Sequence, residues 1–119
     1  MLPAAHRMRR AAQFEQAVRH GARGGRPTLV VHMTPGTDHR PSGPVVGFVV
    51  SKAVGTAVHR NRVKRRLRAL VHDRLDRLDG QVVVRALAPS ASASYEELGR
   101  DLDRAIATAR RRGEQRGRA

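Results

Sequence analysis

The sequence has no cysteine and no tryptophan, and its aromatic residues are limited to Phe14, Phe48 and Tyr95. Without cysteine the chain forms no disulfide and no thiolate zinc site, which fits a reducing compartment. With so few rings, the core must be aliphatic, built mainly from valine, leucine and alanine. No apolar run approaches the ~20 residues that a membrane span needs, and residues 1–10 contain no signal-peptide core. We therefore expect a cytoplasmic protein with no membrane partner.

Acidic residues are also scarce, with ten Asp and Glu against 24 Lys and Arg. The formal net charge is +14 and the isoelectric point is near 11.9, a balance that draws a chain to polyanions such as nucleic acids. All but two of the 24 basic residues are arginine, whose planar fork suits phosphate contacts, although a GC-rich coding bias explains the same skew. At 119 residues the chain has room for one domain.

Residues 60–68 hold six basic residues in nine positions, inside a hydrophobic pattern of helical period. The apolar positions recur at steps of three and four: Val63, Leu67, Leu70, Val71, Leu75 and Leu78. At about 100° per residue they fall within an arc of roughly 140°, the buried stripe of an amphipathic helix. The pattern predicts a helix over residues 56–78, with Thr56 as its N-cap and Gly80 after its end. The cations occupy the remaining arc, mainly in the first half of this helix.

The other segments complete an α+β pattern. We expect a helix over residues 9–20 with Gly21 as a left-handed cap, and strands over residues 28–33, 45–51 and 81–87. A capping box at residues 94–97 begins a last helix that ends near residue 109. The continuous apolar run at 45–50 indicates a strand covered on both faces and well inside the sheet. The resulting αββαβα order predicts a sandwich whose helices pack on one face of a small sheet, the other face being partly free.

These boundaries predict one nucleic-acid-binding domain over residues 1–109 and a basic disordered tail over residues 110–119, where arginine is frequent and no apolar pattern continues. Within the domain, the start of the 56–78 helix is best suited to hold a phosphate. Arg60, Asn61 and Arg62 cluster there beside free amide donors and the positive end of the helix dipole. No acidic residue lies within four positions of the cations in residues 60–68. Their mutual repulsion is therefore uncompensated, which favours an anionic partner over a merely solvated face.

Other functions remain open from the residues alone. The ten acidic residues are dispersed and read as helix caps and solubilising groups, so no cluster indicates a metal site or a metal-dependent nuclease. A metal-free ribonuclease could use His32, His59 and Lys52, but no spacing singles them out. A small ribosomal or RNA-chaperone protein and an architectural DNA-binding protein are further alternatives.

One stretch of the chain resembles the protein subunit of bacterial ribonuclease P. The motifs that carry the resemblance are Val46-Gly47-Phe48-Val49-Val50-Ser51-Lys52, Val54-Gly55-Thr56-Ala57-Val58 and Arg60-Asn61-Arg62-Val63-Lys64-Arg65. It extends from a first helix that contains Phe14, through the valine strand after Gly80, to the start of the last helix. Only the first few residues and the tail fall outside it.

The resemblance implies a subunit of an endoribonuclease whose catalytic RNA, with Mg²⁺ bound mainly by that RNA, removes the 5′ leader of precursor tRNA. The protein alone would be inactive and would hold no catalytic residue and no metal site; no DNA partner is expected. By this resemblance, the catalytic RNA would be contacted by Arg60, Asn61, Arg62, Lys64, Arg65 and Arg68. The single-stranded leader would lie in a cleft between the first helix and the free sheet face, formed by Phe14, Val18, His32 and Lys52.

The resemblance also implies an uncommon left-handed strand-helix-strand crossover, whereas general rules of chain topology favour a right-handed one. Two of the predicted leader residues depart from the family pattern, because Val18 and His32 stand where aromatic residues are frequent. These replacements predict weaker or shifted stacking of the leader. Arg85 is offset by one position from the arginine that many members carry, so the resemblance assigns it no role.

Overall fold

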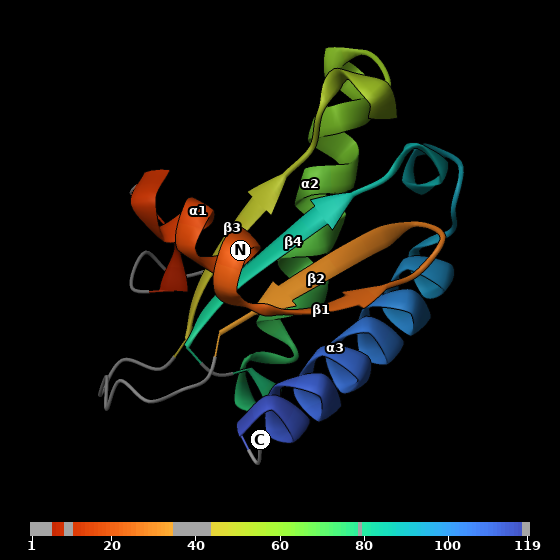
Figure 1. The fold of residues 1–119 in the computed structure, drawn as a ribbon. Helices are drawn as coiled ribbons and strands as arrows, with labels where there is room; N and C mark the ends of the chain where they lie inside the picture. The colour runs from red at the N-terminus through yellow and green to blue at the C-terminus, as the bar shows by residue number, and fades with distance from the viewer. Residues whose placement is uncertain (1–5, 9–10, 35–43, 79, 118–119) are drawn as a thin grey trace.

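The computed structural model describes residues 6–8, 11–34, 44–78 and 80–117. Its helices and strands are α1 (Ala11–His20), β1 (Ala22–Gly25), β2 (Leu29–Met33), β3 (Val45–Val49), α2 (Ala57–His72), β4 (Gln81–Ala86) and α3 (Tyr95–Gly117). Short 3-10 turns lie at Lys52–Val54 (η2), Leu75–Arg77 (η3) and Ala88–Ala91 (η4). The predicted α+β class is confirmed (Figure 1). No helix in the described ranges is long and apolar enough to cross a membrane.

The four strands form one mixed sheet in the order β1-β2-β4-β3. β2 pairs antiparallel with both β1 and β4, whereas β3 and β4 are parallel. In Figure 1, β3 and β4 both point upward, β4 lies to the right of β3, and α2 passes behind the sheet. The β3-α2-β4 crossover is therefore left-handed, as the family resemblance implied and against the usual preference.

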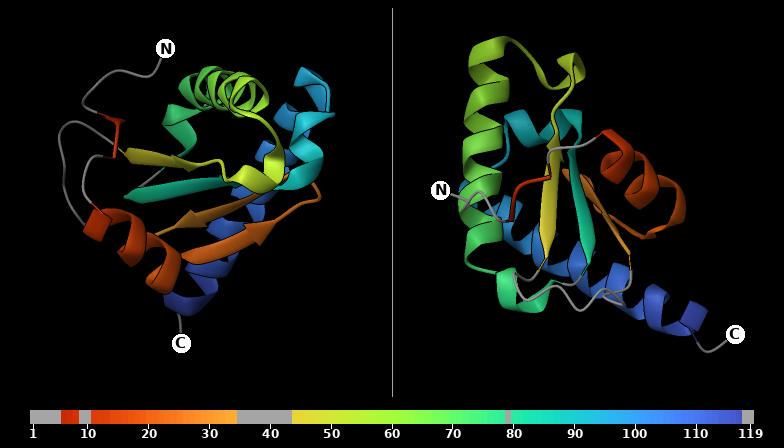
Figure 2. Two further views of the ribbon diagram at one scale, coloured as in Figure 1. Left: turned by 90° about the horizontal axis from the view of Figure 1, so that it is seen from above. Right: turned by 90° about the vertical axis from the view of Figure 1, so that its left-hand side faces the viewer.

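The sheet is covered on both faces, which corrects the expectation that all helices share one face. The larger core joins α2 and α3 to one face, through residues such as Leu67, Leu102 and Val84. A smaller cluster of Met8, Ala17, Val45 and Val83 packs α1 against the opposite face. Figure 2 shows α1 and α2 on opposite sides of the strands. The periodicity of α1 identifies its buried side, but it does not say which face of the sheet that side will meet.

The position of β3 is a second correction. The apolar run at residues 45–50 was expected well inside the sheet, but β3 is an edge strand of the four-stranded order. Its residues are shielded because helices cover both faces and because Met8 N donates a 2.8 Å hydrogen bond to Val46 O at the outer edge. The central apolar strand is β4, whose Val82, Val83 and Val84 are at most 1% exposed.

β1 was not predicted, since Ala-Arg-Gly-Gly contains no strand-forming residue. Its register with β2 and its contact with α3 create it. A Cβ at Gly24 would lie 2.1 Å from the Ala105 carbonyl oxygen, so only glycine permits this close approach. The expected left-handed cap at Gly21 is wrong, because only Gly55 and Gly80 have positive φ among the described residues.

The ends of two helices also differ from expectation. α2 ends at His72 rather than near residue 78, because the Arg74 side chain donates to the Leu70 carbonyl oxygen at 2.8 Å and pairs with Asp103 of α3. α3 continues to Gly117, so residues 110–117 are helical rather than a disordered tail. Arg112 anchors this extension by donating to the Arg23 carbonyl oxygen at 2.8 Å. The expected helix starts agree better with the structure: Thr56 Oγ1 and Ser94 Oγ accept from backbone amides three residues later.

Candidate nucleic-acid interface

The first half of α2 presents a basic face on a fixed scaffold. Its apolar stripe is buried: Val63, Leu67, Leu70 and Val71 are at most 4% exposed. The predicted binding residues occupy the rest of the helix surface, Asn61 and Arg65 being exposed and the others half-buried: Arg60, Arg62, Lys64 and Arg68. The structure thus brings all six together on one helix, which we call the α2 basic face.

Most charges of the α2 basic face have no ion-pair partner among the described residues. Among the described residues, no carboxylate lies within ion-pair distance of Arg60, Arg62, Lys64, Arg65 or Arg68. Arg66 differs, because it donates to the Ala93 carbonyl oxygen at 3.3 Å. The Nε atoms of Arg60 and Arg62 are buried without a hydrogen-bond partner. Polar groups without partners are costly, so these guanidinium groups are suited to donate hydrogen bonds to an external anion.

The face of the sheet that carries α1 forms a second basic surface, which we call the open face. In the strand register, Arg23 of β1, His32 of β2, Val83 of β4 and Gly47 of β3 form one row. His32 is 6% exposed, and neither ring nitrogen has a hydrogen-bond partner. Burial, followed by the charges of Arg23 and Arg85, lowers the pKa of His32 below its ordinary value. At neutral pH the imidazole is therefore uncharged, with one nitrogen to donate and one to accept.

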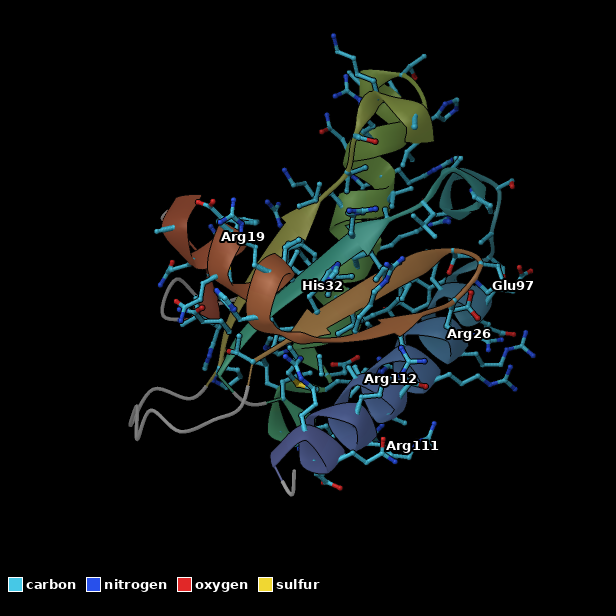
Figure 3. The ribbon with its side chains drawn as sticks, viewed as in Figure 1. Arg19, Arg26, His32, Glu97, Arg111 and Arg112 are labelled. Atoms are coloured by element: carbon cyan, nitrogen blue, oxygen red, sulfur yellow. The ribbon has the colours of Figure 1, made fainter. Side chains whose placement is uncertain are left out.

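The four predicted leader residues come from three elements around this face: α1, β2 and η2. Phe14 of α1 lies directly on β3, because a Cβ at Gly47 would be 2.5 Å from its ring. Val18 follows one helical turn later and is 40% exposed. His32 lies in the row that contains Gly47, whereas Lys52 is exposed in η2, beyond the end of β3. Phe14 and His32 thus share one face, with Val18 beside them, and Lys52 stands at its margin. Figure 3 shows the His32 side chain over the centre of the sheet.

Two basic residues of the open face had no predicted role. Arg85 is exposed on β4 and alternates with the buried Val84 and Ala86, so it points to the same side as Val83. Its strand neighbours are Val30 and Val49. The alternation of Val84, Arg85 and Ala86 at the end of β4 would have identified Arg85 from the sequence. Arg23 could not be found in that way, because its strand was not recognised.

The chemistry of a metal-free ribonuclease is not assembled. His32 lies on the open face, whereas His59 is exposed on α2, which packs against the other face of the sheet. His59 instead contacts its own helix cap, with Nδ1 3.4 Å from Thr56 Oγ1. Within the described ranges, no three His, Asp or Glu side chains gather as metal ligands.

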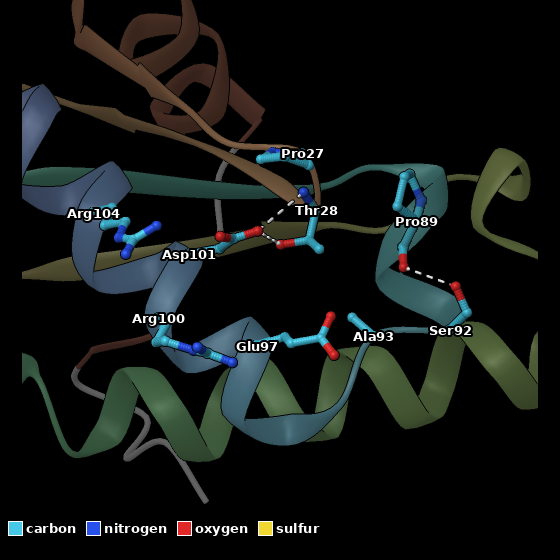
Figure 4. A pocket seen from close by; sticks show the side chains of 9 residues that line it. All are labelled: Pro27, Thr28, Pro89, Ser92, Ala93, Glu97, Arg100, Asp101 and Arg104. Carbon is cyan, nitrogen blue, oxygen red and sulfur yellow. Dashed lines mark hydrogen bonds between the residues drawn. The ribbon is translucent and has the colours of Figure 1, made fainter.

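A pocket of about 340 Å³ lies between the β1–β2 turn, η4 and α3 (Figure 4). Asp101 accepts hydrogen bonds from Thr28 Oγ1 at 2.6 Å and from Thr28 N at 3.3 Å, and it faces Arg26 at 3.6 Å. These contacts tie α3 to the turn between the first two strands. Asp101 and Thr28 of this pocket therefore serve the fold.

The family model for ribonuclease P matches residues 2–110. The chain belongs to the ribonuclease P protein family. It is 54% identical over 108 residues to the ribonuclease P protein component of a Nocardioides species, covering 89% of this chain and 92% of that relative. It is 55% identical over 116 residues to that of Kocuria rhizophila, covering 94% and 98%. A protein component of ribonuclease P is part of an endoribonuclease that includes an RNA partner, and nothing in these similarities supports the ribosomal or RNA-chaperone alternative.

Solved structures of ribonuclease P proteins share the fold. The Staphylococcus aureus protein superimposes with a TM-score of 0.77 at 23% identity, covering 87% of this chain and 94% of that one. The Thermotoga maritima protein gives a TM-score of 0.66 at 20% identity, covering 81% and 90%. At such identities the likeness concerns the fold alone, including its mixed sheet.

Proposed function

We propose that the α2 basic face binds the catalytic RNA of ribonuclease P. The observation that supports this most directly is the set of cations on one rigid helix without carboxylate partners among the described residues, with the buried Nε atoms of Arg60 and Arg62 lacking any acceptor. The five cations of this face would contact phosphates, because a folded RNA is gripped mainly at its backbone and by its shape. Asn61 both donates and accepts, which suits a sugar hydroxyl or a base edge.

The open face would hold the single-stranded 5′ leader of precursor tRNA. Single strands bind in basic grooves that offer rings or other flat surfaces to the bases. Phe14 supplies a ring, Val18 an exposed apolar surface, and Lys52 a cation near the end of β3. The uncharged His32 would offer a hydrogen bond to a base without repelling the strand. Arg23 and Arg85 join this set on structural grounds.

In this function the chain's residues bind and orient, and they carry out no bond-breaking step. The catalytic RNA, with Mg²⁺ bound mainly to it, supplies the hydrolysis that releases the leader and leaves the mature 5′ end of the tRNA. The protein neutralises phosphates on two faces and so brings the leader and the catalytic RNA together. This work would take place in the cytoplasm, where precursor tRNA is made.

The test is 5′ processing of precursor tRNA by the catalytic RNA over a range of Mg²⁺ concentrations, with and without the protein. We expect the protein to lower the Mg²⁺ concentration needed for half-maximal cleavage, because its cations take over part of the neutralisation. An unchanged requirement would contradict the proposal. Cleavage by the protein without RNA would instead favour the metal-free ribonuclease. A variant with both Arg104 and Arg111 replaced by glutamine loses two exposed arginines of α3 and serves as the charge-matched control.

A further inference from the structure

A small pocket at the outer edge of β3 lies between the two proposed RNA surfaces. Its volume is about 140 Å³, and its walls come from α1, β3, α2 and the segment at residues 7–8. Phe14 and Gly47 belong to the open face, whereas Phe48 points to the opposite side and packs against the larger core. Lys64 and Arg68 reach the pocket from α2. The pocket therefore straddles the sheet edge where the open face meets the α2 basic face.

The lining of this edge pocket combines rings with cations. Two of the three aromatic side chains of the whole sequence, Phe14 and Phe48, line it. Arg7, Lys64 and Arg68 contribute positive charge, and no carboxylate takes part. A planar aromatic ligand that carries negative charge matches such a lining, since rings stack on bases and cations hold phosphates.

The size and floor of the pocket restrict the ligand further. Sites for drug-sized molecules begin at roughly 300 Å³, so a pocket of about 140 Å³ admits one ring system rather than a larger ligand. The Phe14 ring and the Met8 sulfur pack closely over Gly47, because residue 47 has no side chain. A side chain there would come within 2.5 Å of the Phe14 ring and 2.9 Å of the Met8 sulfur. Lys64 and Arg68 are one helical turn apart, so both can reach the same phosphate.

We propose that this edge pocket binds one unstacked nucleotide of the bound RNA, its base against Phe14 and Phe48 and its phosphate against Lys64 and Arg68. This inference rests on the proposed function, because the pocket lies where the proposed surfaces for the catalytic RNA and for the leader meet. The nucleotide belongs either to the catalytic RNA or to the leader. Both offer the same base and phosphate, and only the assembled complex distinguishes them.

The first experiment titrates adenosine 5′-monophosphate into the full chain labelled with ¹⁵N, with ribose 5-phosphate as a probe that lacks the base. We expect the nucleotide to shift the amide resonances of Gly47 and Phe48, and ribose 5-phosphate to leave them in place at the same concentration. Phe48→Leu keeps an apolar side chain in the core and should weaken nucleotide binding about fivefold or more. Tyr95→Leu removes an exposed ring elsewhere and should leave it unchanged.

Equal shifts with both probes, or wild-type nucleotide affinity in Phe48→Leu, would overturn the proposal. Thermal unfolding checks that the variant folds, and Phe14→Leu repeats the comparison from the other wall if it does not. In the assembled complex, 2-aminopurine is placed singly in the leader or in the catalytic RNA. A fluorescence change that is lost with Phe48→Leu shows which RNA supplies the bound nucleotide. If no labelled position in either RNA gives such a change, the pocket proposal is refuted. If the Mg²⁺ effect on processing persists while the nucleotide fails to bind, only the pocket proposal fails.

Discussion

Replacing Arg62 and Arg65 together by glutamine should flatten the salt dependence of binding to the catalytic RNA. Five cations of the α2 basic face lack internal partners among the described residues, and Arg66 is left out because it donates to the Ala93 carbonyl oxygen. Each phosphate neutralised contributes about −0.7 to −0.9 to the slope of log affinity against log salt. Five contacts predict a slope of roughly −3.5 to −4.5, and the double variant should reduce its magnitude by about 1.4 to 1.8.

The assay is filter binding or fluorescence anisotropy with the catalytic RNA over a series of monovalent salt concentrations at fixed Mg²⁺. The control is the Arg104→Gln, Arg111→Gln double variant, which removes the same charge from the solvent side of α3. It should keep the wild-type slope, because only contacts at the interface release counterions there. Equal salt slopes for the wild type and both variants would show that the α2 basic face is a solvated surface without RNA contacts. An equal reduction of the slope in both variants would show an effect of net charge alone.

Further predictions concern the open face and the fold. Arg85→Gln should weaken the affinity of the holoenzyme for precursor tRNA while leaving that for leaderless tRNA unchanged; equal loss for both would remove Arg85 from the leader surface. The pKa of His32 is lowered in the folded chain, so as pH falls below about 6.5 the unfolded chain binds the proton first and stability declines. In urea unfolding between pH 7.5 and 5.5, the free energy of unfolding of His32→Leu should decline less than that of the wild type. An identical pH profile for the two proteins would refute this role of His32. Arg74→Ala should cost about 1–2 kcal/mol, because it removes hydrogen bonds to Leu70 and Asp103; an unchanged denaturation midpoint would contradict this.

The sequence predicted elements whose signal is local. α2 begins where Thr56 caps it, and its buried stripe of Val63, Leu67, Leu70 and Val71 has the period expected of a helix. Its end could not be read in the same way, because Arg74 stops the helix by pairing with a residue of α3 that lies far along the chain. The unpredicted continuation of α3 likewise depends on contacts with the carbonyl oxygens of β1 and α1.

The residues of the candidate site also differ in whether local sequence could predict them. The six binding residues of α2 could be predicted together because neighbours on a helix are neighbours in sequence. Phe14 and His32 were predicted through the family resemblance alone, since the row that joins them requires the register of three strands. Arg23 and the edge pocket depend on the pairing of segments whose local sequence gives no sign of it, β1 in one case and residues 7–8 in the other.

Two faces of the chain are proposed to hold two different RNAs, and the absence of cysteine permits a direct measurement of this arrangement. Ala57→Cys places a single thiol at the exposed start of α2, and Gly25→Cys places one on the open face, where a Cβ meets nothing within 4 Å. An iron chelate attached to each thiol cleaves RNA nearby in the assembled complex with precursor tRNA. We expect cuts in the catalytic RNA from position 57 and cuts in the 5′ leader from position 25. Cuts in the leader from position 57, or none in the leader from position 25, would contradict it.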